Sequence, residues 1–238
     1  MTYTRAMLVK AIRTRVFTEG EDLVAFIRAH VRRMPEEAVL VVTSKIVALA
    51  ESRTADPKDR EAVIKAESTY ALRTKYTWLT IKDGTVMASA GVDESNAAGK
   101  LVLLPKDSFE AASALRKKLK KAYGVKKLGI LITDSRLLPL RAGVVGVALG
   151  YAGFKGVRDY RGTKDIFGRV LKLSRTDVAD SLATAAVLCM GEGKEQQPLA
   201  VITDAPVVFA ERIDRAELHI DPKDDLYAPL FSNMPRAK

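Results

Sequence analysis

The sequence predicts a protein of the α+β (mixed α/β) class, and three observations lead to that prediction. The chain has 238 residues, of which 47% are hydrophobic, so it can enclose a sizeable core. Apolar residues recur at helical spacing in some segments and form short β-branched runs in others. The two kinds of segment do not alternate strictly, which argues against a doubly wound parallel sheet.

The first half of the chain combines helices, a buried strand and a hairpin. Residues 21–34 carry apolar side chains along one helical stripe, and the apolar run 38–42 predicts a buried strand. A hydroxyl residue directly after this strand can cap a second helix, which we expect to reach Glu51. The Asp83-Gly84 pair between two strand-like runs predicts a hairpin over residues 78–90.

The second half continues this mixture. Asp107 or Ser108 can cap a long helix that Gly124 terminates, because glycine readily adopts the left-handed conformation of a helix C-cap. Glycines within an apolar run favour a closely packed strand over a helix. The other expected elements are strands at 101–104, 128–132, 144–149, 199–202 and 207–209, and a helix capped by Ser174 or Thr176 that ends at Gly191.

The chain is basic, with 39 Lys and Arg against 29 Asp and Glu and a net charge of +10. Such a surplus suits an anionic partner, either a nucleic acid or a small polyanion. A specific nucleic-acid partner is not expected, because aromatic residues make up only 6% and no basic motif is interleaved with them. Much of the positive surplus lies in one cluster, which we expect to be a solvent-exposed face: Arg116, Lys117, Lys118, Lys120, Lys121, Lys126 and Lys127.

Several common catalytic motifs are absent from the sequence. It contains no P-loop, no dinucleotide-binding glycine fingerprint and no nucleophile-elbow motif. His30 and His219 are the only histidines, so a histidine-based triad or a histidine-rich zinc site is not expected. Cys189 is the single cysteine, which excludes an internal disulfide; its place on an apolar helix face predicts a buried structural thiol.

No membrane association is expected. The longest apolar stretch, residues 142–154, is shorter than the roughly 20 residues that a spanning helix needs, and it contains four glycines. The first ten residues have no apolar core of signal-peptide length. These features predict a soluble, cytoplasmic protein.

Carboxylates follow apolar elements at three separate places: the segment 91–96, the segment 132–135 and the pair Gly191-Glu192. Functional sites are often built where core elements meet loops. Hard divalent cations prefer carboxylate, hydroxyl and carbonyl oxygens, so two or three of these acids together could hold Mg²⁺ or Mn²⁺ against a nucleotide phosphate. Each acid taken alone fits a turn or cap residue better than a metal ligand, because acids are common in turns.

The polar stretch 159–169 offers a further candidate. It contains two glycines and several basic residues, and Arg161 could clamp a phosphate or carboxylate bidentately. The alternative is a surface loop held in place by its own Asp–Arg pairs.

The chain resembles the coenzyme F420-0:γ-glutamyl ligase family. The matching pieces occur in the family's order over most of the sequence. They are Val41-Val42-Thr43-Ser44-Lys45-Ile46-Val47, Gly91-Val92-Asp93-Glu94-Ser95-Asn96, Ile132-Thr133-Asp134-Ser135, Gly150-Tyr151-Ala152-Gly153, Asp159-Tyr160-Arg161-Gly162, Val178-Ala179-Asp180 and Met190-Gly191-Glu192. No single piece is specific, but their common order is.

The resemblance implies a two-lobed fold with mixed sheets and an intertwined homodimer. Residues 1–220 would form one ligase-like domain of two intertwined lobes, followed by a charged, proline-containing tail at 221–238. The implied activity is a GTP-dependent ligase that adds L-glutamate through a γ-glutamyl amide bond to coenzyme F420-0 or a related anionic, carboxylated cofactor. An acyl phosphate would be the intermediate, with Mg²⁺ or Mn²⁺ as metal and K⁺ as a further candidate ion.

The resemblance also implies roles for individual residues. Asp93 and Asp134 would bind one metal ion, and Ser135 and Glu192 a second. Arg141 joins the three acids as a candidate catalytic residue. The residues expected to contact the nucleotide are Ser44, Lys45, Asn96, Arg161, Met190, Gly191 and Gly193.

The sequence departs from the family pattern directly after the second acidic motif. The family usually has an aromatic residue followed by Gly-Arg-Pro-Trp-Arg, whereas this chain has Arg136-Leu137-Leu138-Pro139-Leu140-Arg141. A pocket that loses Trp and Arg should recognise a different ring or phosphate. Two alternatives therefore stay open: a glutamyl ligase acting on another acceptor such as folate, and a non-catalytic nucleotide-binding paralogue.

Overall fold

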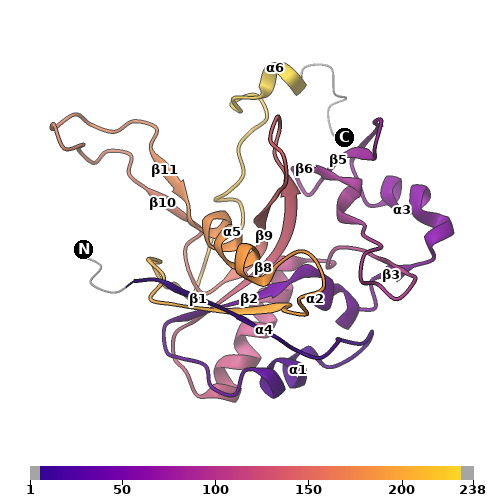
Figure 1. Cartoon of the computed structure of the whole chain (residues 1–238). Coiled ribbons are helices and arrows are strands. Elements are labelled where there is room, and N and C mark those ends of the chain that lie inside the picture. The colour runs from indigo at the N-terminus through magenta and orange to yellow at the C-terminus, as the bar shows by residue number, and fades with distance from the viewer. Residues whose placement is uncertain (1–5, 232–238) are drawn as a thin grey trace.

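A five-stranded mixed sheet lies at the centre of the computed structural model, which describes residues 6–231 (Figure 1). Only its third and fourth strands, β2 and β8, run parallel; the other neighbours are antiparallel. In spatial order the strands are β1 (Leu8–Ile12), β12 (Leu199–Thr203), β2 (Ala38–Thr43), β8 (Leu128–Leu137) and β9 (Val144–Ala152). The predicted α+β class is confirmed.

Helices cover both faces of this sheet (Figure 1). Along β2, Leu40 and its alternate neighbours pack with α1 (Leu23–His30) and α4 (Ser108–Tyr123). Val39 and Val41 point to the other face and pack with α5 (Val178–Met190). Burial on both faces explains why β2 reads as an unbroken apolar run instead of alternating with polar residues.

The long helix α4 follows its predicted boundaries closely. The Asp107 side chain accepts a hydrogen bond from the Glu110 backbone N–H at 2.8 Å, and Gly124 ends the helix at φ +69°. This helix has 16 residues and exposes Lys117, Lys118 and Lys121 of the basic cluster. The prediction that the whole cluster is solvated was wrong for Arg116, which is buried and paired with Glu211, and Lys126 and Lys127 follow the helix. Among residues 6–231, no helix is both long enough and apolar enough to cross a membrane.

Two glycines let the helices approach β9 closely. A Cβ atom on Gly146 would lie 2.4 Å from the Ala183 carbonyl oxygen of α5, and one on Gly150 would lie 2.4 Å from the Ser108 carbonyl carbon of α4. Both contacts involve backbone atoms, which cannot move aside as a flexible side chain can. The glycine-punctuated run therefore forms a closely packed strand, as predicted.

A smaller lobe is formed by residues 54–104, drawn in purple in Figure 1. The predicted hairpin is confirmed and turns at Asp83-Gly84. Ile64, Trp78 and Leu101 form the centre of a separate small core. The elements of this lobe are β3 (Thr54–Ala55), the 3-10 helix η1 (Pro57–Asp59), α3 (Arg60–Ala66), β4 (Tyr70–Arg73), β5 (Trp78–Lys82), β6 (Thr85–Ala88), the 3-10 turn η2 (Ser89–Gly91) and β7 (Leu101–Val102).

Residues 157–177 form an arm that projects from the body of the molecule (Figure 1). Its base is the antiparallel pair β10 (Val157–Asp159) and β11 (Arg175–Asp177). Near its tip, Ile166 is 92% exposed and Phe167 is 84% exposed. Large apolar side chains with so little cover indicate that the tip of the arm has no packing partner among residues 6–231, whereas its base contacts the body through Arg158, which donates to the Pro206 carbonyl oxygen.

The C-terminal segment from residue 204 runs back over the sheet lobe and is fastened to it by side-chain contacts. Glu211 forms a bidentate ion pair with Arg116, with both N–O distances 2.8 Å. Glu217 accepts hydrogen bonds from the hydroxyl of buried Tyr151 and from the Gly156 backbone, both at 2.6 Å. The short helix α6 (Ala228–Phe231) follows, and residues 232–238 of the predicted tail lie outside the described residues.

Several predictions about individual elements were wrong. Cys189 is exposed, because the packed stripe of α5 continues from Ala186 to Met190 and leaves the intervening residues outside. Residues 207–209 form only one bridge, to Phe154, and do not join the sheet. Neither Ser174 nor Thr176 caps α5, because the chain is still extended in β11; Asp177 is the cap. The first helix ends at His30 rather than Met34.

Candidate active site

Four segments that are distant in the sequence meet between the lobe built around the five-stranded sheet and the smaller lobe of residues 54–104. They are the start of α2 (Ser44–Ala50), the loop after η2, the second half of β8, and the residues that follow α5. Side-chain contacts link the start of α2 to the loop after η2 and to β8. Other side-chain contacts link the residues after α5 to the same two segments. The sequence-predicted segments therefore converge in the folded chain.

Lys45 holds the loop that carries Asp93. Its Nζ donates to Asp93 Oδ2 at 2.8 Å and to the Ser95 carbonyl oxygen at 2.6 Å. The Ser95 backbone N–H and hydroxyl also donate to the Asp93 carboxylate, at 2.8 and 2.6 Å. This carboxylate is thus fixed by groups of the chain itself.

The turn that leads to Asp93 has an uncommon backbone. Ser89, Ala90 and Gly91 all have positive φ angles, a conformation that costs free energy for residues with a Cβ atom. A hydrogen bond of 2.8 Å from the Ala90 N–H to Thr80 Oγ1 supports the turn from inside the small lobe. At Gly91, a Cβ atom would lie 2.5 Å from the Leu104 side chain, so only glycine fits without a rearrangement.

Asp134 lies inside a strand, not beyond its end as predicted. The strand β8 continues to Leu137, because its partner β9 extends alongside it with a bulge at Ile132/Thr133. Successive side chains of a strand point to opposite faces. Asp134 accordingly meets the Ser44 hydroxyl of α2 on one face, whereas Ser135 Oγ donates to Glu192 Oε1 at 2.7 Å on the other.

The bulge is held by α5, through a residue whose role sequence analysis missed. Asp180 Oδ1 accepts a hydrogen bond of 2.8 Å from the Ala148 backbone N–H, next to the irregular pairing. Thr184 Oγ1 donates to the Gly146 carbonyl oxygen at 2.7 Å. Bulges redirect side chains near functional sites, and Asp180 holds the bulged segment of β9 that pairs with the strand carrying Asp134. The only sequence signal was its place in the Val178-Ala179-Asp180 motif.

The two central carboxylates have opposite electrostatic surroundings. Burial raises the pKa of Asp134 to about 6, and the nearby charge of Asp93 adds to the rise. Burial would also raise the pKa of Asp93, but hydrogen bonds from Lys45 and Ser95 outweigh it and hold this pKa below its ordinary value. The closer a carboxylate lies to fixed donors, the more its charged form is favoured.

Residues 190–193, which are expected to contact the nucleotide, approach the loop that carries Asp93. Asn96 Nδ2 donates to the Gly193 carbonyl oxygen at 3.3 Å, which joins the two segments. Gly191 has φ +82° and Met190 is buried in the core below. Asn96 and Gly193 are therefore in contact, Gly191 lies in the same loop as Gly193, and Met190 at the end of α5 is part of the core.

The oxygen donors of the site fit a divalent cation whose remaining coordination positions are filled by a bound nucleotide. Within residues 6–231, no three His, Cys, Asp or Glu side chains are grouped closely enough to form a metal site by themselves. The available oxygen donors instead come in pairs, Asp93 with Asp134 and Ser135 with Glu192. Mg²⁺ is commonly bound by one or two carboxylates together with substrate phosphates, so paired donors suit a metal that arrives with a nucleotide.

Two predicted arginines lie away from this convergence. Arg161 is in the projecting arm, where it is ion-paired with Asp159 at 2.5 Å, as the surface-loop alternative expects. Arg141 is exposed in the turn between β8 and β9, and its backbone N–H donates to the Leu138 carbonyl oxygen. Neither side chain contacts the acids of the site within this chain's described residues.

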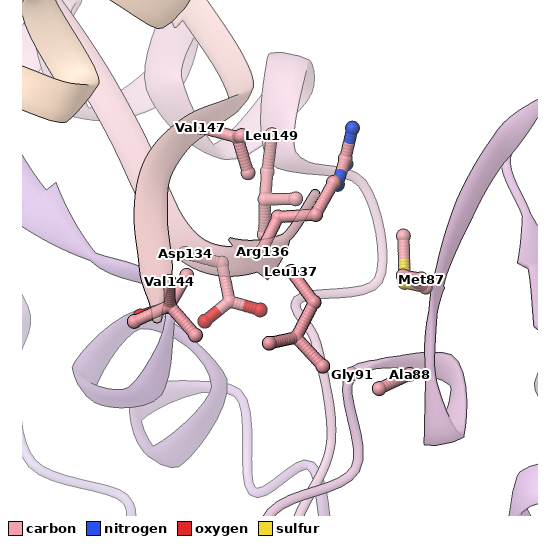
Figure 2. A pocket seen from close by; sticks show the side chains of 10 residues that line it. Met87, Ala88, Gly91, Asp134, Arg136, Leu137, Val144, Val147 and Leu149 are labelled. Atoms are coloured by element: carbon pink, nitrogen blue, oxygen red, sulfur yellow. The ribbon is translucent and has the colours of Figure 1, made fainter. Parts of the chain in front are cut away.

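A cavity of about 170 Å³ adjoins Asp134 (Figure 2). Met87, Ala88 and Gly91 of the small lobe form one wall, and residues of β8 and β9 form the other. Arg136 extends past Leu149, with its guanidinium pointing away from the Asp134 carboxylate in this view (Figure 2). Burial lowers the pKa of Arg136 from its ordinary value, against the attraction of nearby carboxylates.

Comparisons with known proteins agree on one family. The F420-0:Gamma-glutamyl ligase family model matches residues 11–204. The chain is similar to proteins called coenzyme F420:L-glutamate ligase from Methanococcus maripaludis (33% identity, covering 88% of this chain and 84% of the relative) and Archaeoglobus fulgidus (34%, covering 77% and 82%). The relative of that name from Methanocaldococcus jannaschii is 36% identical, covering 71% of this chain and 68% of its own.

Proposed function

The chain belongs to the F420-0:Gamma-glutamyl ligase family, whose members are acid–amino-acid ligases. From this premise we propose that it joins L-glutamate to coenzyme F420-0 through an amide bond between an acceptor carboxylate and the amine of glutamate. One observation carries the proposal to this chain's own residues. The segments of Asp93, Asp134 and Glu192, which the family motifs mark, are linked to one another by the contacts of Lys45, Ser44, Ser135 and Asn96.

The proposed reaction has two steps. A carboxylate oxygen of the acceptor attacks the γ-phosphorus of GTP, which gives an acyl phosphate and GDP. The amine of L-glutamate then attacks the acyl carbon, phosphate leaves, and the amine loses a proton. Phosphoryl transfer depends chiefly on positioning and on neutralising charge, so a site without a side-chain nucleophile or histidine is sufficient.

Asp93 and Asp134 would hold one divalent cation, Mg²⁺ or Mn²⁺, and Ser135 and Glu192 a second. When bound, such cations neutralise the charge of phosphate oxygens and orient them. Lys45 holds the Asp93 carboxylate in place, and Asp180 holds the bulge next to Asp134. K⁺ is a further candidate ion, for which the donor geometry offers no specific argument.

The nucleotide is proposed to lie along Ser44, Lys45, Asn96 and residues 190–193. Lys45 is only partly exposed, with 23% of its side chain accessible, and it is already directed at the acids that would face the triphosphate. The net charge of +10 favours the approach of GTP and of a polyanionic acceptor.

We also propose a homodimer, supported by the projecting arm. The exposed Ile166 and Phe167 need cover, and a second copy of the chain would supply it. The measurement is solution mass by light scattering, with Phe167→Asp as the variant and Lys164→Asp in the same arm as its control. A dimer that dissociates only with Phe167→Asp is expected, and a wild-type monomer at all concentrations would contradict the proposal.

A different acceptor is the second candidate, and one observation favours it. Leu137, Leu138 and Leu140 are exposed in the β8–β9 turn, where the family pattern has Gly, Arg and Trp. An apolar turn beside the cavity would recognise a less charged or differently shaped molecule. Folate and other carboxylated cofactors are therefore part of the test.

Mass spectrometry of a small acceptor panel tests the proposal. The protein is incubated with F420-0 or folate, L-glutamate, a divalent cation, and GTP or ATP. We expect a product heavier by one or more glutamyl residues, formed with GTP and Mg²⁺ or Mn²⁺ and lost when the cation is chelated. Asp134→Asn is the matched inactive control. No glutamyl product with any acceptor and nucleotide would refute the proposed activity.

A further inference from the structure

Arg136 has a buried donor without a partner. In the part of the chain that the structure describes, only two buried side-chain polar atoms lack a hydrogen bond, and they are Arg136 Nε and Thr133 Oγ1. Both lie on the stretch of β8 that carries Asp134. More than nine in ten buried polar groups in native proteins are hydrogen-bonded, so this stretch is an exception that needs a reason.

The exception is costly because a guanidinium stays charged. Arg136 is partly exposed, but its Nε is withdrawn from water without a hydrogen-bond partner, and a charged group in that position gains from an anion that binds it. The carboxylates of Asp180, Asp134 and Asp177 are near enough to attract Arg136 electrostatically, but none forms an ion pair with it among the described residues. The compensation is therefore incomplete within the chain.

The cavity next to Arg136 indicates what kind of group is missing. Its walls are largely apolar and include Met87, Val147 and Leu149. At about 170 Å³ it is smaller than the roughly 300–1,000 Å³ of sites that enclose drug-sized ligands, so it suits a small group and not a whole nucleotide. The apolar surroundings strengthen any ion pair that forms there.

We propose that Arg136 binds an oxyanion, such as a carboxylate, of one of the two non-nucleotide substrates and anchors that substrate with its reacting end toward Asp134. A guanidinium matches the two oxygens of such a group bidentately, which fixes orientation as well as adding affinity. The inference rests on the proposed ligase activity and adds a specificity-determining residue where the sequence departs from the family pattern.

The test compares Arg136→Met and Arg136→Lys with the wild type in steady-state assays that vary GTP, L-glutamate and the acceptor separately. Methionine keeps the length and apolar character of the side chain and removes the charge. Lysine keeps the charge and loses the bidentate geometry. Arg32→Met, an exposed arginine after α1, is the control for the loss of one positive charge.

We expect Arg136→Met to raise the KM of one substrate at least tenfold and to leave the KM of GTP within twofold. A change for L-glutamate identifies its carboxylate as the ligand; a change for the acceptor identifies an acceptor oxyanion. Arg136→Lys should recover part of the loss. Because an uncompensated charge is removed, the melting temperature of Arg136→Met should stay equal or rise.

Two results would overturn the inference. One is an unchanged KM for both non-nucleotide substrates, and the other is an increase for GTP alone. A fall in the melting temperature without a KM change would show that Arg136 is structural. If the wild type proves inactive as a ligase, calorimetry can still measure the binding of L-glutamate and of F420-0 to the wild type and to Arg136→Met. Equal affinity of the two proteins for both molecules, or no binding of either molecule to the wild type, refutes the role of Arg136.

Discussion

The two central acids of the site differ in what surrounds them. Asp93 is held by Lys45 and Ser95 within the chain, and its pKa is lowered. Asp134 is enclosed in the cavity beside Arg136, and its pKa is raised to about 6. The chain itself supplies the hydrogen-bond partners that fix Asp93, whereas the region of Asp134 contains Arg136, whose buried Nε has no partner among the described residues. The difference indicates that Asp93 is held in position before any ligand binds and that a bound ligand completes the surroundings of Asp134.

Asp134→Asn should produce the largest effect. We expect ligase activity to fall about 10²–10³-fold, because the cation proposed to neutralise the phosphate charge would lose a carboxylate ligand. The folded protein without metal should become more stable at pH 8, by up to about 3 kcal/mol for a pKa raised by about two units. A mass-spectrometric rate assay and urea unfolding measure the two effects.

The pH dependence follows from the direction of that shift. Since the folded pKa of Asp134 is raised, the ionised form costs stability as the pH rises through about 6. Below about pH 4 the carboxyl is protonated in the folded and the unfolded state, so the advantage of asparagine should vanish there. A variant that is less stable than the wild type at pH 8 would contradict this view of Asp134.

Asp180→Ala should give the next largest effect, because it releases the bulge between the two regions. The Ala148 N–H would lose its acceptor, which costs about 1–3 kcal/mol, and Asp134 would be less well oriented. We expect kcat to fall about 10–100-fold, since small displacements of reacting groups have effects of this size. Asp180→Asn keeps an acceptor oxygen and should recover most of the activity; equal losses in both variants would show that the charge matters and not the positioning.

Asp93→Asn should have the smallest effect on stability, with a sign opposite to that of Asp134→Asn. Its pKa is lowered in the folded state, so its contribution is present at neutral pH and is lost as the pH falls through the folded pKa. The side chain is 47% exposed, so we expect a loss of about 1 kcal/mol at pH 7. Urea unfolding at pH 7 measures it, and stabilisation by this substitution would abolish the contrast between the two acids.

The sequence was a good guide where local chemistry decides the structure. The caps of α4 at Asp107 and Gly124 and the hairpin turn at Asp83-Gly84 were readable because each depends on neighbouring residues alone. The segments of the site were readable through their order along the chain. The outward position of Cys189 was not, because helical periodicity shows that a helix has an apolar stripe but not how far a neighbouring sheet covers it.

Local patterns and motif order by themselves determined the mixed fold class, the family and the segments that supply the acids. Only the tertiary structure decided how those acids differ. The bulge in β8–β9, the hydrogen bond from the Ala148 N–H to Asp180 of α5, and the buried, unpartnered Nε of Arg136 arise from contacts between residues far apart in the chain. Charge and hydrogen bonding depend on distance and burial in space, which spacing along a sequence does not specify.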